Sequence, residues 1–117
     1  MRLNEVSYTD ALPVDGYGAG FFRIGGEVRD GAQAILPEGV TTWGGFDDAE
    51  TLLKAAGQVD VLLIGTGAEV AHIPAGLRAT LEEAGMGVDA MASPQACRTY
   101  NVLLGEGRRV ALAVLPL

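Results

Sequence analysis

The chain has few of the residues on which disulfides and metal sites depend. Among its 117 residues there is one cysteine, Cys97, and one histidine, His72. A single cysteine cannot form an internal disulfide, which is typical of proteins kept in a reducing compartment. A single histidine cannot supply the three or four Cys and His ligands that zinc usually takes. We therefore expect no disulfide, no metal site and no cofactor.

Long apolar runs and excess positive charge are also missing. No stretch approaches the roughly 20 apolar residues of a membrane helix, and residues 1–5 lack the apolar run of a secretory signal. The 8 basic residues are outnumbered by 15 acidic residues, which gives a net charge of -7. Nucleic acids and anionic membranes bind cationic surfaces, so both are disfavoured as partners. We expect a cytoplasmic protein with no transmembrane segment.

The composition that remains is that of one globular domain. Hydrophobic residues make up 49% of the chain and charged residues 20%, as in ordinary folded proteins. A length of 117 residues suits a single domain over residues 1–117, either as a monomer or as a homodimer.

The first half of the chain has the pattern of short strands separated by turns. Residues 21–24 and 27–29 resemble strands, and the Gly25–Gly26 pair between them predicts a tight hairpin. Two more short strands are expected over residues 32–36 and 40–43. Residues 1–20 are expected to be extended or looped, because a glycine cluster at 16–20 disfavours a helix.

The second half alternates between apolar strands and amphipathic helices. A helix is expected to start at Asp47 or Asp48, where Asp47 has the spacing of a capping box, and to end at Gly57. Ser93 is the expected N-cap of the last helix. The other expected elements are strands over 59–64, 87–91 and 109–115 and a helix over 74–85. This alternation predicts parallel strands with right-handed crossovers, so the fold class is α/β with a mixed sheet.

The segment Gly65-Thr66-Gly67 follows the most apolar strand, at the end where α/β folds bind ligands. Its amides could form an anion nest. The dinucleotide fingerprint is incomplete because Val70 stands where glycine or alanine is required, and there is no Gly-Lys-Ser/Thr. The alternative is that the glycines only allow a sharp exit from the sheet.

The last predicted helix supplies the other half of a candidate cleft. Thr99 and Asn101 could line a polar pocket with the amides of residues 65–67, although satisfying loop amides is the first interpretation for Asn101. The charged segment 106–109 precedes the final strand, and Arg108 in it is a candidate for binding an anion at the rim of the cleft. The alternative is that this segment is a solvated loop with a local ion pair. The cleft candidates are Gly65, Thr66, Gly67, Arg98, Thr99, Asn101, Glu106 and Arg108.

Cys97 could be inert or reactive. It lies on an apolar helix face, where buried cysteines are usually inert. A position in the first helical turn beside Arg98 would favour a thiolate. Nucleophilic catalysis would then require His72 to reach Cys97 across the cleft. His72 is otherwise expected to be a surface or packing residue.

Seven segments occur in the order found in a known family. They are Gly16-Tyr17-Gly18, Phe22-Arg23-Ile24, Leu36-Pro37, Trp43, Leu62-Leu63-Ile64-Gly65-Thr66-Gly67, Ala96-Cys97-Arg98-Thr99-Tyr100-Asn101-Val102-Leu103 and Glu106-Gly107-Arg108-Arg109-Val110. The chain resembles a small-domain family of unknown function that includes the mitochondrial complex I assembly factor 3 and the adipogenesis-associated domain proteins. The resemblance implies three layers: a mixed central sheet, helices on both sides and a small extra β layer. Relatives often have Met, a polar residue and Thr where this chain has residues 91–93.

The resemblance implies no established enzymatic activity. It indicates a binding or assembly module for a protein partner connected with respiratory-complex or membrane-protein biogenesis. The alternative is an enzyme, or a protein that binds a small anionic or amide-bearing ligand, using the cleft between the 65–67 turn and the helix that starts at Ser93.

Overall fold

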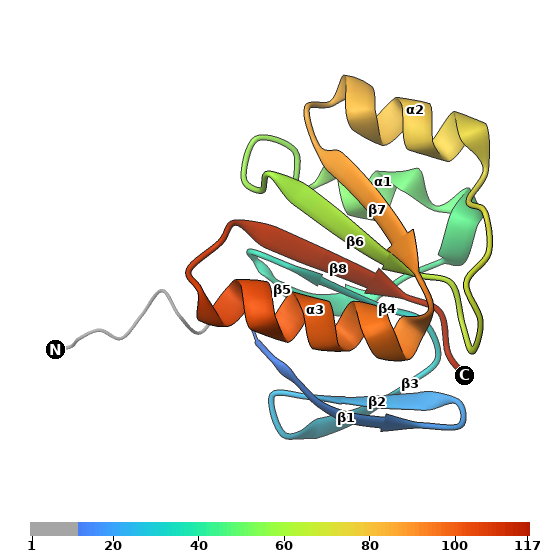
Figure 1. Cartoon of the computed structure of the whole chain (residues 1–117), viewed down its shortest axis with the longest axis vertical. Coiled ribbons are helices and arrows are strands. Elements are labelled where there is room, and N and C mark those ends of the chain that lie inside the picture. The colour runs from blue at the N-terminus through green and yellow to red at the C-terminus, as the bar shows by residue number, and fades with distance from the viewer. Residues whose placement is uncertain (1–11) are drawn as a thin grey trace, which may run out of the picture.

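The central sheet has five strands in the order β5-β4-β8-β6-β7, and it is mixed, as the sequence predicts. Strand β6 pairs in parallel with both β7 and β8, whereas β4 pairs antiparallel with β8 and β5. The computed structural model describes residues 12–117 (Figure 1). The strands are β4 (Gln33–Leu36), β5 (Gly39–Thr42), β6 (Val61–Gly65), β7 (Gly87–Met91) and β8 (Val110–Val114).

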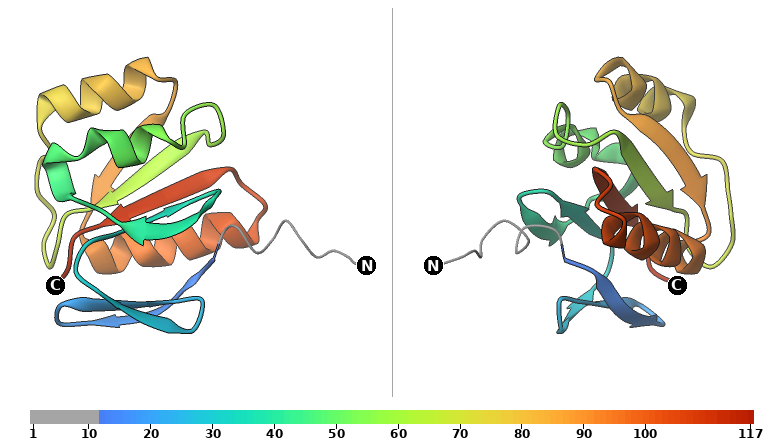
Figure 2. Two further views of the ribbon diagram at one scale, coloured as in Figure 1. Left: turned by 180° about the vertical axis from the view of Figure 1, so that it is seen from behind. Right: turned by 60° about the vertical axis from the view of Figure 1, so that its left-hand side comes forward.

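Helices cover both faces of this sheet, which confirms the predicted α/β fold. Helix α3 (Ser93–Gly105) packs on one face against β6 and β8, while α1 (Ala49–Leu53) and α2 (Ala75–Glu83) lie on the other (Figures 1 and 2). A 3-10 helix, η2 (Gly45–Asp47), precedes α1. Within residues 12–117, none of the helices combines the length and apolar character needed to cross a membrane.

A second, three-stranded antiparallel sheet forms the small extra β layer that the resemblance implies. It consists of β1 (Val14–Gly18), β2 (Phe21–Ile24) and β3 (Glu27–Asp30). Gly25 and Gly26 have φ values of 57° and 87° in the β2–β3 turn, as the hairpin prediction requires. The buried side chains of this sheet pack in one cluster with α3 and one face of β8.

The central strands are buried because their sequences are apolar throughout. All five residues of β8 are buried, as are Leu62–Gly65 of β6, which agrees with the predicted central position of an unbroken apolar run. Alternate residues enter different clusters: Leu62 and Ile64 pack on the α1 and α2 side, and Leu63 packs on the α3 side.

Two expectations for the first helix are wrong in detail. Asp48, and not Asp47, caps α1: its carboxylate accepts hydrogen bonds from the Thr51 amide at 3.1 Å and from the Gly44 amide at 2.9 Å. Asp47 ends the preceding 3-10 helix, where it cannot cap α1. The α-helix itself stops at Leu53, before the predicted end at Gly57. The part of the extended-or-looped prediction that concerns residues 1–11 lies outside the described residues.

Candidate functional site

The turn after β6 and the start of α3 meet, as the cleft hypothesis requires. The Ser93 amide donates to the Gly67 carbonyl at 2.7 Å, and the Gly67 amide donates to Ser93 Oγ at 2.9 Å. The Thr66 amide donates to the Met91 carbonyl at 2.8 Å. Two segments far apart in the sequence are therefore joined at the carboxyl end of β6. We call this contact between residues 65–67 and 91–93 the junction.

The Ser93 side chain is used inside the junction and does not cap its own helix. Its hydroxyl accepts from Gly67 and donates to the Leu115 carbonyl at 2.7 Å, and the residue is 0% exposed. The N-cap position of α3 belongs to Ala92, which makes no side-chain cap hydrogen bond. The N-cap prediction for Ser93 is thus wrong, because the tertiary partners outcompete the local amides.

The junction is filled and leaves no room for a ligand between its two halves. A Cβ atom at Gly65 would lie 2.7 Å from Ser93 Oγ and 2.8 Å from both Ser93 Cα and Val114 Cγ1. Glycine is therefore required here for close approach of two backbones. The Thr66 and Gly67 amides already have internal acceptors, so the predicted anion nest has no free donors from these two residues.

The Thr66 hydroxyl also has internal partners. It donates to the Glu69 carbonyl at 2.7 Å and accepts from the Ala71 amide at 3.0 Å. These bonds hold the loop that leads from β6 toward α2. Thr66 therefore shapes the backbone beside the junction.

Asn101 connects α3 with β1 through a pair of hydrogen bonds. Its Nδ2 donates to the Val14 carbonyl at 2.7 Å, and its Oδ1 accepts from the Val14 amide at 2.9 Å. The neighbouring Tyr100 hydroxyl donates to the Leu12 carbonyl at 2.9 Å. Asn101 thus satisfies backbone groups, as the first interpretation holds, and its amide is not directed at the 65–67 turn.

Arg98 and Thr99 lie on α3 away from the junction hydrogen bonds. Arg98 is exposed, and its Nη1 donates to the Tyr17 hydroxyl of β1 at 3.3 Å. Thr99 is half-buried. Neither of these side chains makes a hydrogen bond to residues 65–67 within the described part of the chain.

Glu106 and Arg108 lie near the amino ends of β6 and β8, whereas the 65–67 turn lies at their carboxyl ends. The β6–β8 register pairs Val61 with Val110 and Gly65 with Val114, so the chain enters β8 beside the start of β6. Four residue steps along the strand separate these two ends by roughly 13 Å. The prediction that these charges share a cleft with the glycine turn is wrong, because α3 runs back along the sheet before β8 begins.

Cys97 has the environment of an inert thiol. It is 2% exposed, and burial raises its pKa to about 11, an effect that the charge of Arg98 only partly opposes. It is the fifth residue of α3, beyond the first turn in which a thiolate would be favoured. Among residues 12–117, no three His, Cys, Asp or Glu side chains form a group that could hold a metal ion.

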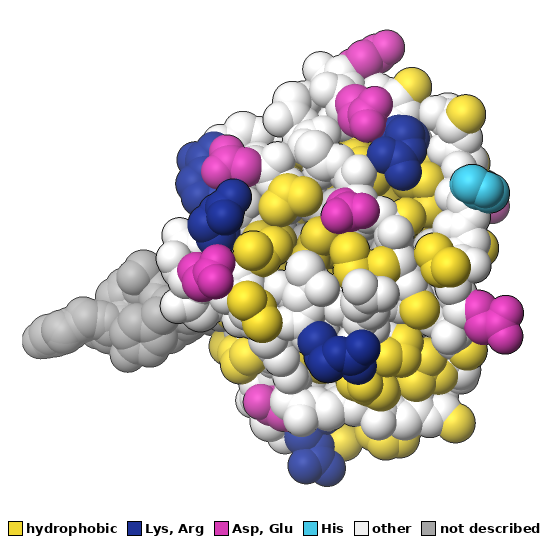
Figure 3. Space-filling view, in the orientation of Figure 1, with side chains coloured by type: hydrophobic (Ala, Val, Ile, Leu, Met, Phe, Trp, Pro, Cys, Tyr) yellow, Lys and Arg dark blue, Asp and Glu magenta, His cyan; other side chains and the backbone are white. Residues whose placement is uncertain are grey.

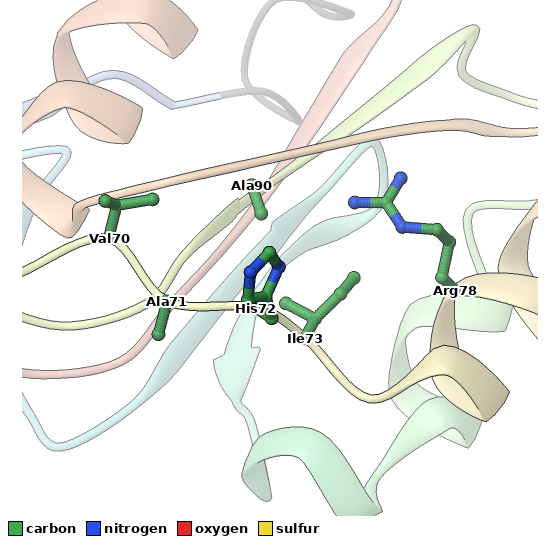
Figure 4. A pocket seen from close by; sticks show the side chains of 6 residues that line it. All are labelled: Val70, Ala71, His72, Ile73, Arg78 and Ala90. Atoms are coloured by element: carbon green, nitrogen blue, oxygen red, sulfur yellow. The ribbon is translucent and has the colours of Figure 1, made fainter.

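A surface pocket lies beside the junction, on the loop that Thr66 holds. It has a volume of about 340 Å³ and is open to solvent between this loop, α2 and β7 (Figure 4). The sequence does not indicate this pocket, because a pocket built by a loop, a helix and a strand has no contiguous motif. Its lining residues are Val70, Ala71, His72, Ile73, Arg78 and Ala90.

Comparison with known proteins agrees with this fold. Residues 14–115 match the family described as "Protein of unknown function (DUF498/DUF598)". The chain belongs to this family. A protein from Rhodobacter capsulatus, described as an uncharacterized protein, is 50% identical over 117 residues, which are 100% of this chain and 94% of that protein.

Other proteins similar to this chain have more specific names. A Danio rerio protein named NADH dehydrogenase (ubiquinone) 1 alpha subcomplex assembly factor 3 is 29% identical over 102 residues, covering 81% of this chain and 59% of that protein. The chain thus spans about three-fifths of the length of this assembly factor. A crystal structure described as an outer membrane protein from Bartonella henselae is 36% identical with a TM-score of 0.83, covering 91% of this chain and 95% of that one.

Proposed function

We propose that this chain is a non-enzymatic binding module that holds a partner protein while a respiratory complex or another membrane complex is assembled. The observation that carries the proposal is that the polar side chains of the candidate cleft make their hydrogen bonds within the chain itself. Ser93, Thr66 and Asn101 all bond to backbone groups of the same chain. Groups held in this way position the backbone and are not presented to a substrate.

The burial of the Cys97 thiol also supports a non-enzymatic role. Nucleophilic catalysis needs an accessible thiolate with a base at hydrogen-bond distance. Cys97 is buried with a raised pKa, and His72 lies on the exposed loop before α2. The two side chains are on different elements, and no hydrogen bond connects them in the described part of the chain.

The likeness to proteins named as NADH dehydrogenase assembly factors supports the choice of partner. It extends over 81% of this chain, so the shared part is nearly the whole domain. The remaining two-fifths of the Danio rerio protein has no counterpart in this alignment, and the proposal concerns the shared domain alone. We propose a cytoplasmic location for this activity.

Deletion of the gene in its host tests the proposal. Membrane complexes are separated on a native gel, and the NADH dehydrogenase complex is detected by its NADH-oxidising activity and by antibodies to its subunits. We expect less assembled complex and more partial assemblies in the deletion strain. The wild-type chain should restore assembly, and Thr80→Ala, a change at an exposed position of α2, should restore it equally. Unchanged assembly kinetics in the deletion strain would refute the proposal.

A ligand screen tests the alternative function, in which the protein binds a small molecule. A small ligand present at 100 times its dissociation constant stabilises a protein by about 2.7 kcal/mol. We expect no such stabilisation by phosphates, carboxylates or nucleotides in thermal unfolding. A shift of that size with one of them would favour a small-ligand function instead.

A further inference from the structure

Strand β7 is an edge of the central sheet, and part of its outer edge is open. Alternate residues of a parallel strand direct both backbone groups toward the same neighbour. The Gly87 amide donates to the Asp60 carbonyl and the Met91 carbonyl accepts from Thr66, so these β7 residues face β6. Val88 and Ala90 therefore direct their amides and carbonyls away from the sheet.

The two outward-facing residues are used differently. The Val88 carbonyl accepts from Arg78 Nη1 at 3.0 Å. Within residues 12–117, the outward amide and carbonyl of Ala90 make no hydrogen bond. Ala90 also lines the pocket. The pocket thus contains a strand position that can pair with another backbone.

The pocket combines apolar walls with positive charge. Val70, at 68% exposed, supplies most of the apolar surface, whereas Ile73 is 8% exposed and forms part of the pocket floor; His72 and Arg78 supply nitrogen donors (Figure 4). Both contacts of Arg78 use Nη1, which lies 3.4 Å from the Glu82 carboxylate and donates to Val88. Such an exposed ion pair contributes little energy, so it competes weakly with another carboxylate.

The remaining surface makes this combination distinctive. The chain carries 15 acidic and 8 basic residues. On the face shown in Figure 3, basic side chains are scattered, and hydrophobic side chains lie exposed between α2 and α3. The pocket is one place where an arginine, an apolar wall and an open strand edge coincide.

We propose that the open edge of β7 binds an extended peptide segment of a partner protein, which adds a strand beside Ala90 and directs an acidic side chain toward Arg78. This inference rests on the proposed function, because the segment belongs to the protein being assembled. Strand addition obtains affinity from backbone hydrogen bonds and specificity from pockets for alternate side chains. Arginine is well suited to a carboxylate because it donates two parallel hydrogen bonds.

The net charge of -7 opposes an acidic ligand at long range. At 0.15 M salt, however, the screening length is about 8 Å, so the groups lining the pocket dominate the local interaction. Binding of an acidic peptide should therefore be sensitive to a single negative charge added inside the pocket. Binding should be insensitive to the same charge placed elsewhere on the surface.

A nuclear magnetic resonance titration of the ¹⁵N-labelled full chain at 0.15 M salt tests the inference. The probe is an octapeptide of alternating threonine and valine with one central glutamate. We expect the Ala90 amide to show the largest shift, and the Arg78 Nε signal to move with it. A peptide with glutamine in place of the glutamate should bind about fivefold more weakly, because charge-assisted hydrogen bonds are stronger than neutral ones by about 1 kcal/mol. Largest shifts at β5, the other sheet edge, or no shifts at all would overturn the assignment.

Two matched variants separate the pocket from general charge. Ala71→Glu places a carboxylate in the pocket, whereas Ala79→Glu places the same charge on an exposed α2 position outside its lining. We expect Ala71→Glu to reduce probe affinity at least tenfold and Ala79→Glu to change it less than twofold. Equal effects of the two variants would refute a local site. Dispersed amide spectra of both variants verify that they fold.

The same variants distinguish this inference from the proposed function. In the deletion strain, Ala79→Glu should restore complex assembly and Ala71→Glu should not. If both restore it, the peptide site is wrong and the assembly role stands. If deletion has no effect on assembly, the assembly role is wrong, whatever the probe binds.

Discussion

Replacement of Ser93 by alanine tests whether the junction stabilises the fold. The change removes an acceptor from the buried Gly67 amide and a donor from the Leu115 carbonyl. Leaving a buried polar group without a partner costs about 1–3 kcal/mol. Because Gly67 is buried and Leu115 is half-buried, we expect Ser93→Ala to lower the free energy of unfolding by about 2–4 kcal/mol in total.

Urea unfolding followed by circular dichroism measures this loss. With a slope of about 1.5 kcal/mol per molar urea, a loss of 3 kcal/mol lowers the midpoint by about 2 M. Thr80→Ala is the control, because it removes a hydroxyl from an exposed α2 position and should change stability by less than about 0.5 kcal/mol.

Replacement of Ser93 by asparagine separates the junction from helix capping. Asparagine caps helices as well as serine does, so a capping role predicts wild-type stability for Ser93→Asn. The junction predicts a loss at least as large as that of alanine, because a position that is 0% exposed and packed against Gly65 has no room for the longer side chain. Wild-type stability of Ser93→Asn, or a loss below about 1 kcal/mol in Ser93→Ala, would refute the reasoning.

Three further outcomes follow from the same geometry. Gly65→Ala should lower the free energy of unfolding by about 1–3 kcal/mol, and adding Ser93→Ala should not rescue it, because Ser93 Cα remains 2.8 Å from the new methyl; rescue in urea unfolding would contradict this. Cys97 should react with a disulfide reagent at pH 8 about 100-fold more slowly than the same thiol at its ordinary pKa, and reach the ordinary rate in denaturant; a fast native reaction would disprove its burial. A hydrogen bond from Thr51 lowers the pKa of Asp48 below its usual 3.8. Its contribution to stability should therefore be present above pH 3.8 and be lost as the pH falls through the lowered value, so wild type and Asp48→Asn should converge in acid; a gap that persists at low pH would exclude this linkage.

The sequence predicts most of the elements because local patterns determine them. The apolar run of β6, the period of α2 and the Gly25–Gly26 turn each depend on neighbouring residues, and the structure confirms them. The strand order is different in kind. It places β8 between β4 and β6 through pairings across dozens of residues, which no local pattern encodes.

The candidate site was less predictable, because side chains choose partners that the sequence does not show. Ser93 has the sequence context of an N-cap, yet its hydroxyl bonds to Gly67 and Leu115. Arg108 follows the last helix closely in sequence, yet it lies at the opposite end of the strands from residues 65–67. The meeting of the β6 turn with α3 follows from the parallel pairing of β6 with β7, which places the carboxyl ends of both strands together.

The position of β8 has a consequence for how the chain is made. Both hydrophobic clusters take residues from this strand: Ala111 and Ala113 enter one, and Leu112 and Val114 enter the other. Without this segment the central sheet is divided into two separate strand pairs, β5-β4 and β6-β7. Completion of the central sheet therefore requires synthesis to pass Val114, and a polypeptide that ends before β8 leaves the facing edges of β4 and β6 unpaired, a state that favours aggregation.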